Sequence, residues 1–112
     1  MIEKLKRIEQ SIDEKKGEHI LLYDFRNHNP FVDYVFITSA SNTTQVNAIA
    51  NHVAKTAKEI GLEVRGIEGN QGSPWILVDL NNVIIHVFQE EERSLYKLEK
   101  LYADVKQMDL SE

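Results

Sequence analysis

The chain has no cysteine and only two prolines among its 112 residues. The absence of cysteine excludes disulfides, thiol nucleophiles and thiolate metal sites, and it fits a reducing compartment. No apolar run approaches the roughly 20 residues that a membrane-spanning helix needs, and the charged start MIEK does not have the form of a signal peptide. We therefore expect a cytoplasmic domain that does not associate with membranes.

Basic residues are in the minority. Lys and Arg number 13 against 18 Asp and Glu, so the formal net charge is −5 at pH 7. Binding to nucleic acid depends on clustered Lys and Arg that neutralise phosphates, and the sequence has no basic stripe of that kind. We expect little direct contact with nucleic acid, whereas a basic protein partner would be attracted by charge. The same mild acidity could also serve solubility alone.

Recognisable arrangements of catalytic or metal-binding residues are missing as well. The four histidines are scattered, and no two of them lie four residues apart. The glycines do not form a phosphate-binding loop between a strand and a helix. No predicted strand carries two acids one residue apart, an arrangement that can hold Mg²⁺ for nucleotidyl transfer. We therefore expect no catalytic residue, no metal and no cofactor.

Hydrophobic periodicity predicts one domain over residues 1–112, in the order helix, strand, strand, helix, strand, strand, strand, helix. This order predicts a mixed α/β (α+β) fold in which helices flank a five-stranded mixed sheet. Residues 108–112 are expected to form a frayed tail. The expected strands are 19–25, 34–38, 62–67, 75–80 and 83–88.

The first two helices carry recognisable end signals. After an apolar stripe that begins at Ile2, Gly17 is expected to close the first helix in a left-handed conformation. Asn42 is the expected N-cap of the second helix, and Gln45 fits the capping-box pattern. Gly61 is expected to end that helix.

The segment 74–102 is the most informative part of the sequence. Its two strands flank Asn81 and Asn82, and this spacing is typical of a two-residue hairpin turn. Pairing across the turn gives the hairpin one aliphatic face, which is expected to join the core. The other face is mixed, and either the last helix or a partner covers it. The mixed face consists of Trp75, Leu77, Asp79, Ile84, His86 and Phe88.

The last helix is expected to begin with the acidic run 90–92, because the positive end of the helix dipole stabilises carboxylates. The same glutamates could also dock to a basic partner, and the two roles are compatible. The expected buried stripe of this helix consists of Leu95, Leu98, Leu101 or Tyr102, and Val105.

Three motifs of this segment, WILVDL (75–80), VIIHVF (83–88) and LYKLEKLY (95–102), resemble the ribosomal silencing factor family, also called Iojap-like proteins. The upstream motifs LYD (22–24), DYVFI (33–37) and VRGIEG (64–69) are similar to that family in the same order. The resemblance implies a fold similar to nucleotidyltransferases without their catalytic acids. A divergent nucleotidyltransferase-fold enzyme, or a nucleotide-binding protein, is the alternative.

For function, the resemblance implies a translational repressor. Such a protein would bind the large ribosomal subunit through ribosomal protein number fourteen and sterically block joining of the small subunit under nutrient limitation. The resemblance also implies that the unbound chain can form a homodimer, which would compete for the same surface.

The resemblance carries the family's partner-binding positions onto this chain. Trp75 and Tyr96 are expected to give apolar contacts, and Asp79 and Glu99 to face basic groups. Leu98 and Tyr102 stay open as contact or core, and the family usually has Trp where this chain has Tyr102. The complete set implied for partner binding is Trp75, Asp79, His86, Tyr96, Leu98, Glu99, Lys100 and Tyr102.

Overall fold

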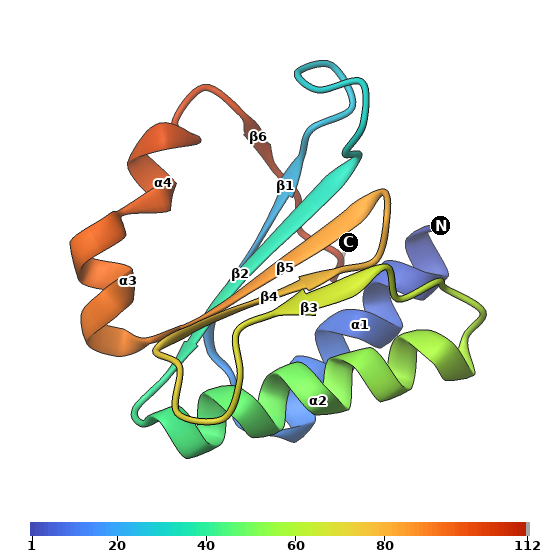
Figure 1. The fold of residues 1–112 in the computed structure, drawn as a ribbon. Helices are drawn as coiled ribbons and strands as arrows, with labels where there is room; N and C mark the ends of the chain where they lie inside the picture. The colour runs from blue at the N-terminus through green and yellow to red at the C-terminus, as the bar shows by residue number, and fades with distance from the viewer. Residues whose placement is uncertain (112) are drawn as a thin grey trace.

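The computed structural model describes residues 1–111. These residues fold around one six-stranded mixed sheet (Figure 1). The strands lie in the order β3-β4-β5-β2-β1-β6, and β2 and β5 are parallel while the other neighbours are antiparallel. The helices are α1 (Ile2–Glu14), α2 (Thr43–Glu59), α3 (Glu90–Tyr96) and α4 (Leu98–Leu101). The strands are β1 (Glu18–Asp24), β2 (Tyr34–Ala40), β3 (Gly66–Glu68), β4 (Trp75–Asp79), β5 (Val83–Gln89) and β6 (Lys106–Gln107).

The predicted mixed α/β class is confirmed, but the predicted number of strands is wrong. The sixth strand, β6, has only two residues and pairs with Tyr23 and Asp24 of β1. A two-residue strand is too short to produce an alternating hydrophobic pattern, so the sequence gives no signal for it.

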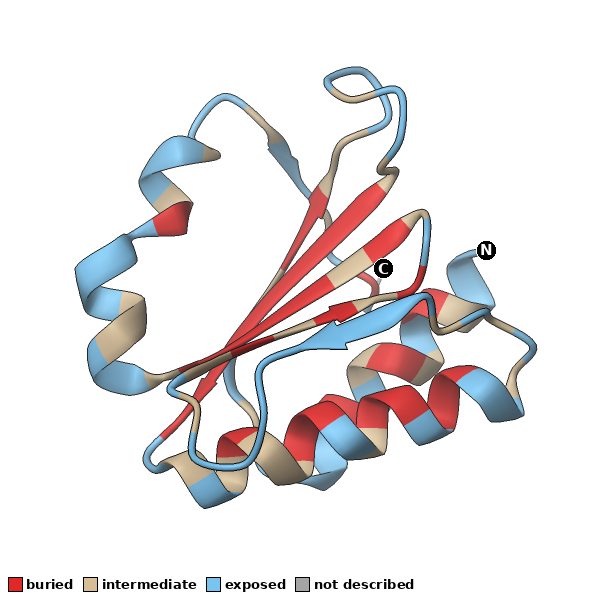
Figure 2. Cartoon of the chain, in the orientation of Figure 1, coloured by how far each residue is buried: buried red, intermediate tan, exposed pale blue. Residues whose placement is uncertain are grey.

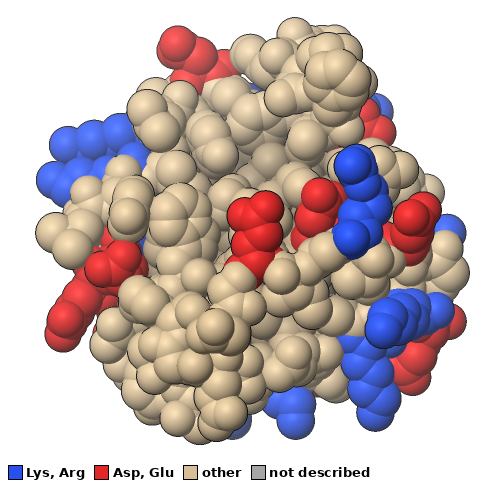
Figure 3. Space-filling model, viewed as in Figure 1, with Lys and Arg blue, Asp and Glu red and all other residues tan. Residues whose placement is uncertain are grey.

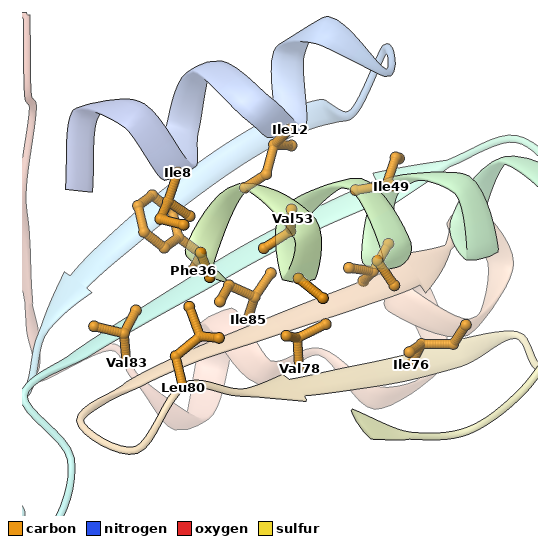
Figure 4. Close-up of a cluster of buried hydrophobic side chains, with 14 of the residues drawn as sticks. Ile8, Ile12, Phe36, Ile49, Val53, Ile76, Val78, Leu80, Val83 and Ile85 are labelled. Atoms are coloured by element: carbon orange, nitrogen blue, oxygen red, sulfur yellow. The ribbon is translucent and has the colours of Figure 1, made fainter. Parts of the chain in front are cut away.

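The main core lies between the sheet and the layer formed by α1 and α2, which covers one face of the sheet (Figures 1 and 4). The hairpin register is confirmed, since Asp79 pairs with Ile84 and Leu77 with His86. Burying each aliphatic side chain of the core stabilises the fold by about 1.5–3 kcal/mol. The aliphatic face of the hairpin is fully buried: Ile76, Val78, Leu80, Val83, Ile85 and Val87.

The capping prediction for α2 is confirmed at both ends and corrected in one detail. The Asn42 side chain accepts a hydrogen bond of 2.9 Å from the Gln45 backbone N–H, and Gly61 has a φ of 81° after the helix. The Gln45 side chain, however, donates to the carbonyl oxygens of Lys15 and Lys16 at 3.3 and 3.4 Å. It therefore ties the start of α2 to the end of α1 and does not close a capping box.

The C-terminal residues of the described chain are held on the core, so the prediction of a frayed tail over 108–112 is wrong for most of its length. The Met108 N–H donates to the Leu22 carbonyl at 2.8 Å, and Leu110 is buried in the main core. Two apolar side chains in a five-residue stretch are enough to anchor a segment whose remaining residues are polar. Residue 112 lies outside the described residues.

Gly17 is required for a close approach and does not adopt the left-handed conformation that we predicted for it. The residue with positive φ at the end of α1 is Lys16, with a φ of 66°. A Cβ on Gly17 would fall inside contact distance of Ile12 Cγ2 and 2.8 Å from Thr38 Oγ1. The absence of a side chain at this position is therefore what lets the chain pass between α1 and β2.

We expect Gly17→Ala to lower the free energy of unfolding by about 1–3 kcal/mol, because the added methyl group overpacks a closed site. The matched control is Gly66→Ala, since a Cβ at Gly66 meets nothing within 4 Å. Urea unfolding of both variants measures the difference. Equal stability of the two variants would contradict the close-approach explanation.

Candidate docking surface

The second face of the sheet is covered only in part, by the C-terminal residues 90–105, which we call the arm (Figure 2). The arm is not the single helix that we predicted. Lys97 adopts a left-handed conformation with φ 52° and ψ 51°, and it separates α3 from α4. Leu95 and Leu101 are each 74% exposed. The predicted buried stripe is therefore wrong at Leu95, and of its two alternatives Leu101 and Tyr102 the one that packs on the sheet is Tyr102.

The other residues of that stripe do pack against the sheet. Leu98 is 9% exposed and joins a second core with Val35, Ile37 and Phe88. Tyr102 is half-buried, and its ring meets those of Tyr23 and Phe25 edge-on, with ring centroids 5.3 and 4.9 Å away. Burial raises the pKa of the Tyr102 hydroxyl. Leu98 therefore belongs to the core, and Tyr102 fixes the arm to β1.

Arg93 anchors the arm. Its guanidinium pairs with Glu99 at 2.6 Å across the break, and it donates to the Ser39 hydroxyl at 3.0 Å and to the Glu18 carbonyl at 3.4 Å. Burial acts to raise the pKa of Glu99, but the hydrogen bond from Arg93, a backbone hydrogen bond and the Arg93 charge together outweigh it, so the pKa is lowered. Glu99, which we expected to face a basic partner, thus has its cation within the same chain.

Four aromatic rings meet where β4 and β5 approach α3. The Trp75 ring stacks on Phe88 with centroids 4.7 Å apart, and it lies 4.6 Å from the Tyr96 ring. Trp75 also donates its indole N–H to His86 Nδ1 at 3.1 Å. Tyr96 is 52% exposed whereas Phe88 is buried. The cluster therefore presents Tyr96 and part of Trp75 to solvent on a rigid support.

His86 is held in its neutral form. Burial lowers its pKa from 6.5 to about 4, and its Nδ1 must carry a lone pair to accept the Trp75 hydrogen bond. The ring proton consequently lies on Nε2. His86 thus orients Trp75 at neutral pH and carries no charge that could attract a partner.

The remaining predicted residues lie on either side of this cluster. Asp79 is half-buried at the end of β4, where its Oδ1 accepts from the Asn81 N–H at 2.8 Å. Asn81 has a φ of 77°, as the predicted hairpin turn requires. Lys100 lies exposed on α4. The structure thus brings Trp75, His86 and Tyr96 together and leaves Lys100 apart from them.

Two features of this face were not predicted from the sequence. A hollow of about 260 Å³ lies beside the arm. Phe31 is 82% exposed in the loop between β1 and β2, where the Asn29 side chain accepts from the Phe31 N–H at 2.7 Å. Because Phe31 lies between predicted strands, no periodic pattern marks it. The hollow is lined by Phe25, Asn29, Val32, Val35, Glu68, Leu77, Asp79, Ile84, His86 and Tyr102.

The acids near the strand ends serve local contacts. Asp24 pairs with Arg26 at 2.7 Å, and hydrogen bonds from Arg26 lower the pKa of Asp24 to about 2. Asp33 accepts from the Asn82 side chain at 3.3 Å.

Within residues 1–111, the one group of three side chains spaced closely enough to hold a metal ion is Glu18, His19 and Glu90, all exposed. No helix in this described part of the chain is long and apolar enough to cross a membrane.

The fold and this face define a mixed α/β domain with a candidate protein-docking surface of fixed aromatic rings beside a shallow hollow. The family model described as "Ribosomal silencing factor during starvation" matches residues 1–112. The chain belongs to this ribosomal silencing factor family, as the sequence motifs led us to expect.

Individual relatives agree with this assignment. The chain is 40% identical to Ribosomal silencing factor RsfS of Bacillus subtilis (strain 168) over 106 residues, which cover 95% of this chain and 90% of the relative. A crystal structure of a Bacillus halodurans protein superposes with a TM-score of 0.83 at 33% identity, covering 96% of this chain and 97% of the other. A more distant relative, the mouse protein "Mitochondrial assembly of ribosomal large subunit protein 1", is 32% identical over 64% of this chain and 33% of its own length.

Proposed function

We propose that the chain represses translation by binding the large ribosomal subunit through ribosomal protein number fourteen. Bound there, it blocks joining of the small subunit when nutrients are limiting, and it acts in the cytoplasm. Family membership supports the silencing role. The name of the mouse relative, which refers to the large ribosomal subunit, supports the choice of subunit.

The exposed apolar side chains of the arm are the observation that indicates which surface binds the partner. Leu95, Tyr96 and Leu101 are between 52% and 74% exposed, and Tyr96 rests against the Trp75 ring. Large apolar side chains that stand in solvent on a rigid support are typical of interface hot spots. Contact made through this face needs no bond to be formed or broken, so repression follows from steric occlusion.

Direct binding is tested by sedimentation of purified large subunits with the protein at low and moderate salt. Cosedimentation with isolated large subunits, together with a lower yield of joined ribosomes, is the expected result. Protein that stays in the supernatant at both salt concentrations would remove the basis of the proposal. A mass measurement over a concentration series tests the proposed homodimer of the unbound chain.

We expect Tyr96→Ala to weaken subunit binding at least tenfold, because an exposed aromatic anchor at an interface centre contributes roughly 2 kcal/mol. The matched control is Ile2→Ala, which removes a 44% exposed apolar side chain from α1 on the opposite layer. Binding is measured by sedimentation and stability by thermal unfolding. If both variants bind like the parent chain, Tyr96 is not a contact.

A further inference from the structure

The hollow beside the arm has an uneven chemical lining. Its floor is apolar, with Val35 of β2, Leu77 of β4 and Ile84 of β5 on the same face of the sheet. Its charged lining residues are Glu68 and Asp79, and no Lys or Arg among residues 1–111 lines it. Figure 3, which looks toward the β3 edge of the sheet, shows acidic side chains near the middle of the view, with a basic side chain beside one of them. The hollow therefore favours an occupant with an aliphatic body and a positive end.

The two acids are positioned to act on one cation. Glu68 pairs with Leu77 and Gly66 with Asp79, so the carboxylates occupy diagonal positions on neighbouring strands. Diagonal neighbours on one face of an antiparallel pair lie about 7–8 Å apart at their Cα atoms, which long side chains can bridge. Gly66 has no side chain to fill the place directly opposite Asp79. One oxygen of Asp79 is engaged by the turn at Asn81, and the other is not.

A hydrogen-bond donor also lines the hollow. His86 is 8% exposed, and its Nδ1 accepts from Trp75. Its proton is consequently on Nε2, and within residues 1–111 the structure gives that nitrogen no hydrogen-bond partner. This N–H is not among the fully buried side-chain atoms without a partner in the described residues, so it is open to the hollow and can donate to an occupant that brings a carbonyl oxygen.

We propose that this hollow is a socket for one arginine or lysine side chain of the ribosomal partner protein, with a main-chain carbonyl of the same segment accepting from His86. The aliphatic stem lies over Val35, Leu77 and Ile84, and the cationic head pairs with Glu68 and Asp79. This inference rests on the proposed function. It adds Glu68 to the docking surface and gives Asp79 a direct contact.

The test uses Glu68→Gln, Asp79→Asn and their combination in sedimentation with large subunits over a salt series. Asp79→Asn keeps the oxygen that accepts from Asn81, and Glu68 is exposed on the edge strand, so both variants preserve the turn and the sheet. Each substitution is expected to weaken binding about fivefold to tenfold and to flatten its salt dependence. The matched control is Glu59→Gln, which makes the same change in charge on an exposed residue of α2, in the layer on the opposite face.

The outcomes separate the two proposals. Failure of the parent chain to sediment with large subunits defeats the proposed function. Binding by the parent chain that is weakened no more by Glu68→Gln than by Glu59→Gln overturns the socket and leaves the proposed function standing. If Asp79→Asn lowers the thermal midpoint, Glu68→Gln alone decides between these results.

Discussion

Arg93→Ala is expected to weaken binding to large subunits by about 100-fold and to lower the free energy of unfolding by about 2 kcal/mol. The guanidinium joins α3 to α4 through Glu99 and joins the arm to β1 and β2 through the Glu18 carbonyl and Ser39. Its removal leaves a partly buried carboxylate and a buried hydroxyl without their donor. The arm then loses its fixed position, and Tyr96 loses the rigid placement that an anchor needs.

The two effects are measured separately, by sedimentation with large subunits and by urea unfolding. Lys55→Ala is the control, because it removes one positive charge from an exposed position on α2. Glu99→Gln should lie between the parent chain and Arg93→Ala, since the amide oxygen still accepts one hydrogen bond. Full binding by a destabilised Arg93→Ala variant would show that the position of the arm does not matter for docking.

The hairpin could be predicted in detail because its information is local. A strand has a period of two residues and the turn has two, so the register and both faces follow from the positions of Asn81 and Asn82. The same reasoning placed Trp75 and His86 on one face, which the register confirms. The hydrogen bond between them is seen only in the structure. The family resemblance assigned Tyr96 and Trp75 to partner binding, and their contact with each other is seen only in the structure.

The arm could not be predicted in the same way because its conformation depends on distant contacts. The helical pattern of Leu95, Leu98 and Leu101 is continuous in the sequence, yet Lys97 breaks it with a left-handed backbone. That conformation costs roughly 1–2 kcal/mol for a residue with a Cβ. The pairing of Arg93 with Glu99 and the burial of Leu98 stabilise it, and Arg93 contacts Ser39, which is 54 positions away in the chain.

The break changes which apolar residues face the partner. A straight helix with its leucines buried, as predicted, would keep Leu95 and Leu101 out of solvent. The observed arm buries Leu98 and turns Leu95 and Leu101 outward. The mixed face of the hairpin is therefore divided: Phe88 packs in the core, while Trp75 and the hollow stay accessible.

His86 is expected to make the fold acid-sensitive. Burial lowers its pKa from 6.5 to about 4, so the unfolded chain binds a proton in this interval and the folded chain does not. The contribution of His86 to the free energy of unfolding is therefore fully present above pH 6.5. It falls by about 3 kcal/mol as the pH falls from 6.5 to 4, and by no more below that.

The measurement is the free energy of unfolding at pH 7, 5.5 and 4.5 for the parent chain and for His86→Gln, which does not titrate. The carboxylates with shifted pKa values contribute equally to both proteins, so the difference between the two curves isolates His86. The parent curve should fall toward that of the variant as the pH decreases. Parallel curves would mean that the imidazole ionises in the folded protein as freely as in the unfolded chain.

Protonation of His86 is also expected to affect partner binding, because His86 accepts the hydrogen bond that positions Trp75. Protonation of Nδ1 removes the acceptor of the indole N–H, and the neutral ring is what holds Trp75 against Phe88 and Tyr96. Subunit binding by the parent chain should therefore weaken only as the pH falls through about 4, where the folded protein itself takes up the proton. Trp75→Phe keeps the stacked ring but removes the N–H, so its binding should depend less on pH. An equal pH dependence of binding in both proteins would show that the hydrogen bond does not couple His86 to the surface.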